Sequence, residues 1–336
     1  MRIVFEAMNC GMLAITDARS ARTRRALGRV PGWFAAWEQT LSRFRAESEL
    51  SRLNASPGQL VAASPTLLRV VGVALWAARA SDGLVAPTLL AALEAAGYDR
   101  DFDELRDRDG QRGTAAEEPP GREAAGVAAS TRATRGTGAP SGAGGPVPPC
   151  HAAWRAIVCD LGARRLGLPP GARMDLGGVA KGWAADVAAR RLGRHGPALV
   201  DASGDLAASA PPRGRPGGPI AIEDPSRAGR PLPLLCLRRG GVATSGRDHR
   251  RWRRGGVWQH HILDPRTGRP AETDVLSATV VARSAVEAEV AAKVALILGS
   301  GAGLAWIEQR PRLAALLVLE DGQVLASRRF DRCTWS

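Results

Sequence analysis

The spacing of apolar and polar residues predicts a chain of short strands and a few longer helices. Residues 1–17 alternate and predict an opening strand. Apolar positions at helical spacing predict helices over 33–41, 64–80, 179–192 and 284–298. Short apolar runs predict strands at 156–168 (a pair turning at Gly162), 198–201, 219–223, 232–237, 261–263, 276–282, 314–319 and 324–327. Because these elements do not alternate strictly, the order favours an α+β fold over a doubly wound one.

The ends of several elements carry clear signals. Ser64-Pro65 places a capping hydroxyl and a first-turn proline at the start of the second helix. Glycines follow two of the predicted helices, at 193 and 299, where a helix commonly stops. The final two strands flank Glu320-Asp321-Gly322 and predict a closing hairpin.

Residues 111–149 differ in composition from everything around them. Apart from alanine, their only apolar side chains are Val127 and Val147. Such a segment cannot bury enough surface to offset its chain entropy. We therefore expect a single domain over residues 1–336, interrupted by a disordered insertion at about 111–149.

Charge and length restrict the function classes. The 336 residues carry a net charge of +13, and only Lys181 and Lys293 are lysines among 46 basic residues. With 4% aromatic residues there are few stacking platforms for single strands, so nucleic acid is not the expected partner, and an anionic dinucleotide fits the basic charge as well. No apolar run reaches 18 residues and no signal peptide is visible, which predicts a cytoplasmic protein without an integral membrane segment, although an upstream start could hide an export signal.

The first candidate site is the run MDLGGVAKGWAAD over residues 174–186. Two glycines precede a predicted helix, and backbone amides at such a turn can bind a phosphate. Asp175 lies before the turn and Lys181 one turn into the helix. The sequence is not a P-loop, because no Lys-Ser/Thr follows Gly182, and a simple strand-to-helix cap remains the alternative.

The second candidate site combines GVATSG at 241–246 with HHILDPRTG at 260–268. Ser245 offers a hydroxyl, and His261 is a candidate general base near neutral pH. The structural alternative is a plain turn, for which the DPRTG segment is well suited. The arginine-rich run 247–254 between the two segments is interpreted as a solvated basic face.

Taken in chain order, several blocks resemble the ApbE family of FAD:protein FMN transferases, the flavinyltransferases. The DLGGVAKGWAAD run is similar to the family pattern D-L-G-G-I-A-K-G-Y-A-V-D, and HILDPRTGRP is similar to H-I-I-D-P-R-T-G-x-P. The remaining similar blocks are AMNC at 7–10, LSRF with SELSRLN at 41–54, the segment from Asp82 to Tyr98, LVDASGD at 199–205, and ATSG at 243–246.

The resemblance implies a two-lobed, T-fold-like α+β fold with an FAD cleft between the lobes. It also implies transfer of FMN from FAD to a Thr hydroxyl of an acceptor flavoprotein as a phosphoester, with release of AMP. The alternative is a degenerate member that binds FAD, or hydrolyses it as a pyrophosphatase, without modifying a protein.

The same resemblance assigns residues to roles. His261 matches the histidine that activates the incoming hydroxyl, and Lys181 is placed to neutralise charge on the pyrophosphate. The implied FAD-binding residues are Met8, Phe44, Asn54, Gly97, Tyr98, Asp175, Lys181, Ser245 and Ile262.

The implied Mg²⁺ site departs from the family pattern. A backbone oxygen near Gly178 and the carboxylate of Glu289 retain ligand chemistry, but Lys293 stands at a family ligand position. A charged ammonium has no lone pair and cannot coordinate a metal. Two interpretations remain: the Lys293 charge replaces the metal, or Lys293 and Glu289 form an ordinary i, i+4 helix ion pair.

Overall fold

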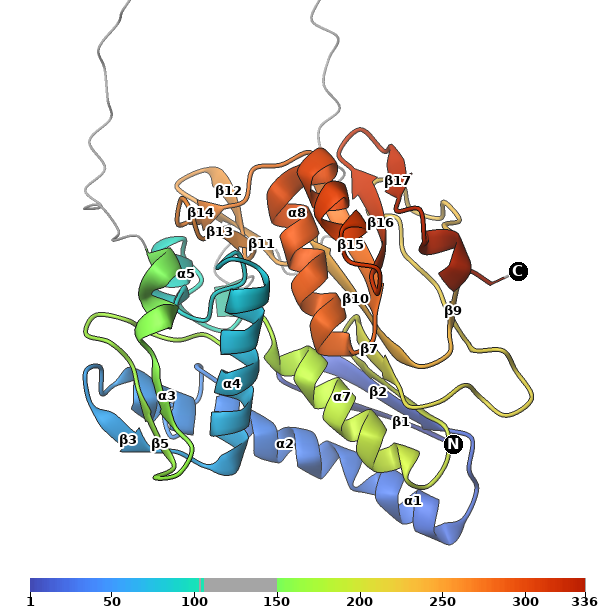
Figure 1. Cartoon of the computed structure of the whole chain (residues 1–336), viewed down its shortest axis with the longest axis horizontal. Coiled ribbons are helices and arrows are strands. Elements are labelled where there is room, and N and C mark those ends of the chain that lie inside the picture. Colours follow the sequence, from blue (N-terminus) through green and yellow to red (C-terminus); the bar gives the residue numbers. More distant parts are fainter. Residues whose placement is uncertain (103, 106–149, 336) are drawn as a thin grey trace, which may run out of the picture.

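A computed structural model describes residues 1–102, 104–105 and 150–335. Its centre is an antiparallel eight-stranded sheet (Figure 1). The strands lie side by side in the order in which the chain forms them, so this sheet needs no crossover. They are β1 (Arg2–Ala7), β2 (Cys10–Thr16), β6 (Ala198–Ala202), β7 (Asp205–Ala208), β10 (Gly240–Gly246), β15 (Val275–Ala282), β16 (Ala314–Leu319) and β17 (Val324–Ala326).

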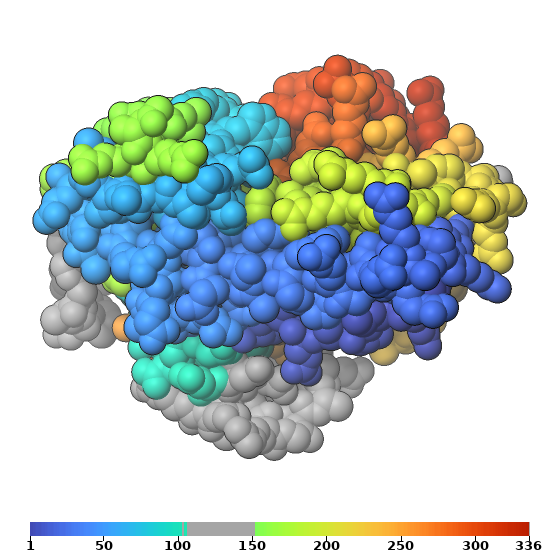
Figure 2. Space-filling view, turned by 90° about the horizontal axis from the view of Figure 1, so that it is seen from below, coloured from blue at the N-terminus to red at the C-terminus, as the bar shows by residue number. Residues whose placement is uncertain are grey.

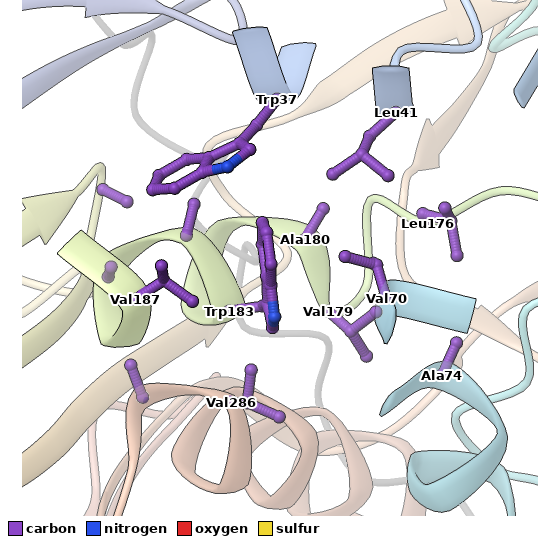
Figure 3. Packing of buried hydrophobic residues seen from close by; sticks show 14 of the residues in the cluster. Trp37, Leu41, Val70, Ala74, Leu176, Val179, Ala180, Trp183, Val187 and Val286 are labelled. Carbon is purple, nitrogen blue, oxygen red and sulfur yellow. The ribbon is translucent and has the colours of Figure 1, made fainter. Parts of the chain in front are cut away.

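Two long helices cover one face of this sheet. Helix α7 (Ala180–Gly193) packs on β6 and β7, and α8 (Ala285–Glu308) packs on β10 and β15. Helices α1 (Ala21–Gly28) and α2 (Val30–Leu41) lie next to α7, where Figure 2 shows the N-terminal segment and α7 forming one continuous surface. Trp183 of α7 lies between Trp37 of α2 and Val286 of α8, with the two indole rings 5.1 Å apart and edge to face (Figure 3).

The remaining elements lie outside the eight-stranded sheet. Beside the main sheet, Figure 1 shows α3 (Glu49–Asn54), α4 (Pro65–Ala80) and α5 (Leu90–Ala95) gathered with the sheet of β3 (Leu60–Ala62), β5 (Arg165–Gly167) and β4 (Val158–Asp160). The others are β8 (Gly218–Ile220) with β9 (Leu235–Leu237), β11 (Arg251–Arg254) with β12 (Val257–His260), β13 (Leu263–Asp264) with β14 (Arg269–Pro270), and the 3-10 turns η1 (Cys150–Ala156) and η2 (Phe330–Cys333).

The α+β class is confirmed, but some elements were predicted wrongly. The opening segment is a hairpin and not one strand, because Met8 and Asn9 both take left-handed backbone angles, with φ of 51° and 56°. Two such residues make the tight turn that suits the twist of paired strands. Of residues 261–263, only Leu263 belongs to a strand, β13, and the sequence patterns did not indicate α1, α3, α5, β3, β7, β10, β11, β12 or β14. The segment predicted as an insertion, 111–149, lies outside the described residues.

Helix α8 was predicted to end near Gly299. Helical geometry does break there, with φ of 81° at Gly299, but a second helical stretch continues the element to Glu308. Among the described residues, α8 is the one helix long and apolar enough in composition to cross a membrane. Its packing against β10, β15 and α7 supplies another reason for its apolar character, since this places it in the core.

Candidate functional site

A cleft of about 1950 Å³ opens where the β1–β2 turn, the Gly177-Gly178 turn, β10 and α8 converge. Most of the residues singled out from the sequence line it together, although they come from distant parts of the chain. These are Met8, Phe44, Tyr98, Asp175, Gly178, Lys181, Ser245, His261, Ile262, Glu289 and Lys293.

Asn54 and Gly97 do not line this cleft. The Asn54 side chain donates to the carbonyl of Met174 at 2.8 Å and accepts from its N–H at 2.7 Å, so it holds the backbone that leads to Asp175. Gly97 takes a φ of 101°, and a Cβ there would lie 3.0 Å from the indole nitrogen of Trp252. Both residues support the walls of the cleft from behind.

The Gly177-Gly178 turn is fastened through Asp175. One carboxylate oxygen of Asp175 accepts from the N–H of Gly177 at 2.9 Å, and the other pairs with Nε of Arg43 at 3.0 Å. The N-cap residue of α7, Val179, makes no side-chain cap hydrogen bond, but the N–H groups of Ala180 and Gly182 donate to the carbonyl of Leu176 and to Oε2 of Glu289. That the glycine turn binds an anion stays a prediction.

Close packing of α7 on α8 sets the depth of the cleft. A Cβ at Gly182 would lie 2.8 Å from Oε2 of Glu289 and 2.9 Å from the backbone nitrogen of Val286. The Asp186 carboxylate accepts from the N–H groups of Ala285 at 2.9 Å and Val286 at 3.2 Å, and so caps α8. The last residue of the DLGGVAKGWAAD run therefore orients the helix that carries Glu289 and Lys293.

Four charged residues form what we call the floor cluster: Lys181, Asp205, Glu289 and Lys293. Nζ of Lys181 donates to Oδ2 of Asp205 at 2.6 Å and to the carbonyl of Ser203 at 3.4 Å. Nζ of Lys293 donates to Oε1 of Glu289 at 3.0 Å, while Oε2 of Glu289 accepts from the N–H of Gly182 at 3.1 Å. The two lysines of this chain thus meet at one site.

Burial perturbs these groups in opposing ways. Burial alone would lower the pKa of Lys181, but the attraction of Asp205 and Glu289 outweighs it and the pKa is raised. Burial and the neighbouring Asp205 raise the pKa of Glu289 to about 7, against the attraction of Lys293 and Lys181. The cluster holds Lys181 charged and leaves Glu289 close to its titration point at neutral pH.

His261 faces the cleft and His260 does not. Nδ1 of His261 is buried and has no hydrogen-bond partner among the described residues. Burial, together with the positive charges of Arg250 and Lys293, lowers the pKa of His261 well below 6.5. The ring of His261 is therefore neutral at neutral pH, the protonation state that a general base needs, and its lowered pKa makes it a weaker base than an ordinary histidine. His260 instead directs Nε2 to the carbonyl of Ala271 at 3.1 Å.

Arg43 was not singled out in the sequence, although it lies inside the LSRF block. Its guanidinium donates to the carbonyl of Tyr98 at 2.9 Å and lies 4.1 Å from the Phe44 ring centre and 4.6 Å from that of Tyr98. Tyr98 in turn packs on Trp252, with ring centres 5.3 Å apart. We call Arg43, Phe44, Tyr98 and Trp252 the aromatic wall.

The interpretation of 247–254 as a solvated basic face is wrong for three of its residues. Trp252 is 3% exposed, and Arg247 donates to the carbonyls of Val275 and Thr273. Arg250 lines the cleft and donates to Sγ of Cys10 at 2.9 Å. In the β11–β12 pair, successive residues point to opposite sides of the strand. Trp252 can therefore be buried although its neighbours in the strand are arginines.

The residues implied for Mg²⁺ do not fit a divalent cation. Both oxygens of Glu289 already have partners: Oε1 accepts from Lys293 and Oε2 accepts from the N–H of Gly182. The charged ammonium of Lys293 cannot coordinate a metal. A Cβ at Gly178 would lie 3.8 Å from Cε of Lys293, so the lysine stem runs beside that backbone. Over the described part of the chain, no group of three or more His, Cys, Asp or Glu side chains could hold a metal ion.

A model of the ApbE family matches residues 15–317, and the chain therefore belongs to the ApbE family. Proteins named FAD:protein FMN transferase are similar to it. The one from Treponema pallidum is 35% identical over 168 residues, 47% of this chain and 46% of the relative. The one from Salmonella typhimurium is 30% identical over 158 residues, 46% and 45%. These alignments span about half the length of either relative.

Solved structures share the fold over the whole chain. The ApbE protein of Thermotoga maritima superimposes with a TM-score of 0.78 at 23% identity, covering 100% of this chain and 99% of that one. The flavinyl transferase ApbE of Pseudomonas stutzeri gives a TM-score of 0.71 at 23% identity, covering 100% and 97%. At these identities the likeness concerns the fold.

Proposed function

We propose that this protein is an FAD:protein FMN transferase that moves FMN from FAD to a Thr hydroxyl of an acceptor protein and releases AMP. The observation that carries the proposal is the convergence of a neutral His261 with the floor cluster in one large cleft. Family membership and the names of the relatives support it.

Each side of the cleft has a chemical task in this proposal. The aromatic wall offers exposed ring surface, with Phe44 at 38% exposure, to the flavin or adenine. The Gly177-Gly178 turn and the two lysine ammonium groups attract the pyrophosphate. Such fixed charges stabilise the additional negative charge of a phosphoryl-transfer transition state.

The transfer step follows from this placement. The Thr oxygen forms a bond to the phosphorus on the FMN side, and the bond from that phosphorus to the bridging oxygen breaks. AMP leaves with the bridging oxygen, and the hydroxyl proton passes to the neutral ring of His261.

Incubation with FAD and an acceptor protein bearing a Thr-containing flavinylation segment tests the proposal. We expect a fluorescent acceptor band, a mass increase equal to the FMN phosphoester, and AMP in equal amount. An acceptor Thr→Ala variant should stay unlabelled. Release of FMN and AMP with no labelled acceptor would instead identify a FAD pyrophosphatase, in which water replaces the Thr hydroxyl.

A further inference from the structure

Both lysines of a chain that otherwise uses arginine lie in the floor cluster. Each forms a short ion pair with a carboxylate, 2.6 Å for Lys181 with Asp205 and 3.0 Å for Lys293 with Glu289. The ammonium of lysine is a compact point charge with three donors, whereas a guanidinium is broad and planar. The stem of Lys293 runs within ordinary contact distance of Gly178, where a Cβ would lie 3.8 Å from Cε.

The acidic and basic side chains of the floor cluster differ in how far they are exposed. The side chains of Asp205 and Glu289 are 3% and 1% exposed, whereas those of Lys181 and Lys293 are 20% and 17% exposed. All four residues line the cleft, and the lysine side chains are the more exposed members of the cluster. The second oxygen of Glu289 accepts from the N–H of Gly182, which fixes the carboxylate, and the first oxygen then holds Lys293 in position.

A dinucleotide brings two negative charges on its pyrophosphate, which a divalent cation commonly neutralises. The floor cluster offers two ammonium groups instead, next to the Gly177-Gly178 turn. Charges held in a poorly solvated site interact more strongly than charges in water. Because Lys181 and Lys293 pair with Asp205 and Glu289, the cluster is formally neutral, and its ammonium groups act on the pyrophosphate as charged hydrogen-bond donors.

We propose that the ammonium groups of Lys293 and Lys181 bind the pyrophosphate of FAD directly and take the place of a divalent cation, so that FAD binds without Mg²⁺. This inference rests on the proposed function only in taking FAD as the ligand. Binding and transfer are separate measurements, so each statement can fail alone.

The test follows FAD binding by quenching of flavin fluorescence, once with a chelator and once with millimolar Mg²⁺. We expect the affinity of the natural protein to agree within roughly twofold between the two conditions, because its cationic charge is covalently fixed. Lys293→Met should bind FAD about 10- to 100-fold more weakly in chelator, the loss typical of one hydrogen bond to a charged group.

Three variants sharpen the result. Lys293→Thr provides an oxygen ligand, and its FAD affinity should recover when Mg²⁺ is added. Lys293→Met combined with Glu289→Gln avoids an unpaired buried carboxylate and should still bind FAD weakly. Arg22→Gln on α1 removes one exposed charge that does not line the cleft and should leave FAD affinity unchanged. Riboflavin, which lacks phosphate, should bind Lys293→Met as well as it binds the natural protein.

Either of two results overturns the inference. One is a loss of FAD affinity greater than tenfold when the natural protein is placed in chelator. The other is unchanged FAD affinity in chelator for both the single Lys293→Met variant and its combination with Glu289→Gln. If the single variant does not fold, judged by its thermal transition, the double variant and the chelator measurement decide. Metal-independent FAD binding without protein labelling would retain this inference and remove the proposed transfer activity.

Discussion

The aromatic wall and the floor cluster face the same cleft but use charge differently. On the wall, Arg43 lies over the rings of Phe44 and Tyr98 and pairs with Asp175, which is 20% exposed. In the floor cluster, the partner carboxylates are at most 3% exposed. A buried charge left without its partner is costly, whereas a ring contact near solvent contributes modestly. We therefore expect the floor to govern reactivity and stability, and the wall to tune affinity.

The largest expected effect is on the transfer rate, from the residue that borders the floor cluster. His261→Ala should slow transfer by about 10²- to 10⁴-fold, because a general base acts on the transition state. FAD affinity should change little, since the substitution removes no charge at neutral pH. Single-turnover labelling at saturating FAD measures this, and an unaltered rate would remove His261 from the mechanism.

The second effect is on the stability of the floor. Lys181→Met leaves Asp205, 3% exposed, without its partner and should lower the free energy of unfolding by about 3–5 kcal/mol. Adding Asp205→Asn should restore much of this loss, because the unpaired buried charge is then gone. Urea unfolding of the single and double variants gives both values, and equal losses in the two would contradict the pairing.

Substitutions in the aromatic wall should have a smaller effect, and on FAD affinity. Phe44→Ala should weaken FAD binding by about 3- to 10-fold, the worth of one aromatic contact, and leave the rate at saturating FAD unchanged. Trp76→Ala is the matched control, since Trp76 is also an exposed aromatic at 42% but lies on α4 outside the cleft. A lowered saturating rate in Phe44→Ala would show that the wall also positions the reacting groups.

A smaller effect is expected in the dependence of the transfer rate on pH. The pKa of His261 is lowered, so the ring stays neutral as pH falls through 6.5, and transfer should decline only at more acidic pH. Replacing Lys293 by Met removes one of the positive charges that depress this pKa, so the acid limb should move toward higher pH. Folding lowers the pKa of His261, so the folded protein also loses stability as pH falls below 6.5. In that range the unfolded chain binds a proton that the folded chain does not.

The smallest effect is expected for residues 111–149, whose composition cannot support a core. Replacing them with a short Gly/Ser linker should leave FAD affinity within roughly threefold, measured by the same fluorescence titration. A marked loss of solubility or of binding would show that the segment packs on the domain.

Sequence reasoning succeeded where chemistry is local. A Gly-Gly turn before a helix, a Ser-Pro helix start and the closing hairpin all depend on neighbouring residues, and the structure contains each of them. Sequence reasoning failed where the backbone turns at residues whose types do not indicate a turn. Met8 and Asn9 turn the chain in a left-handed conformation that the alternation of residues 1–17 did not reveal.

The sequence by itself determined the ApbE resemblance, the α+β class and most of the residues that line the cleft, because these are carried by ordered motifs and short-range periodicity. Only the tertiary structure decided that Lys181 and Lys293 share one site, that Arg43 joins the aromatic wall, and that Asn54 and Gly97 lie behind it. Ion pairs and burial depend on which distant segments are packed together, and no spacing along the chain encodes that directly.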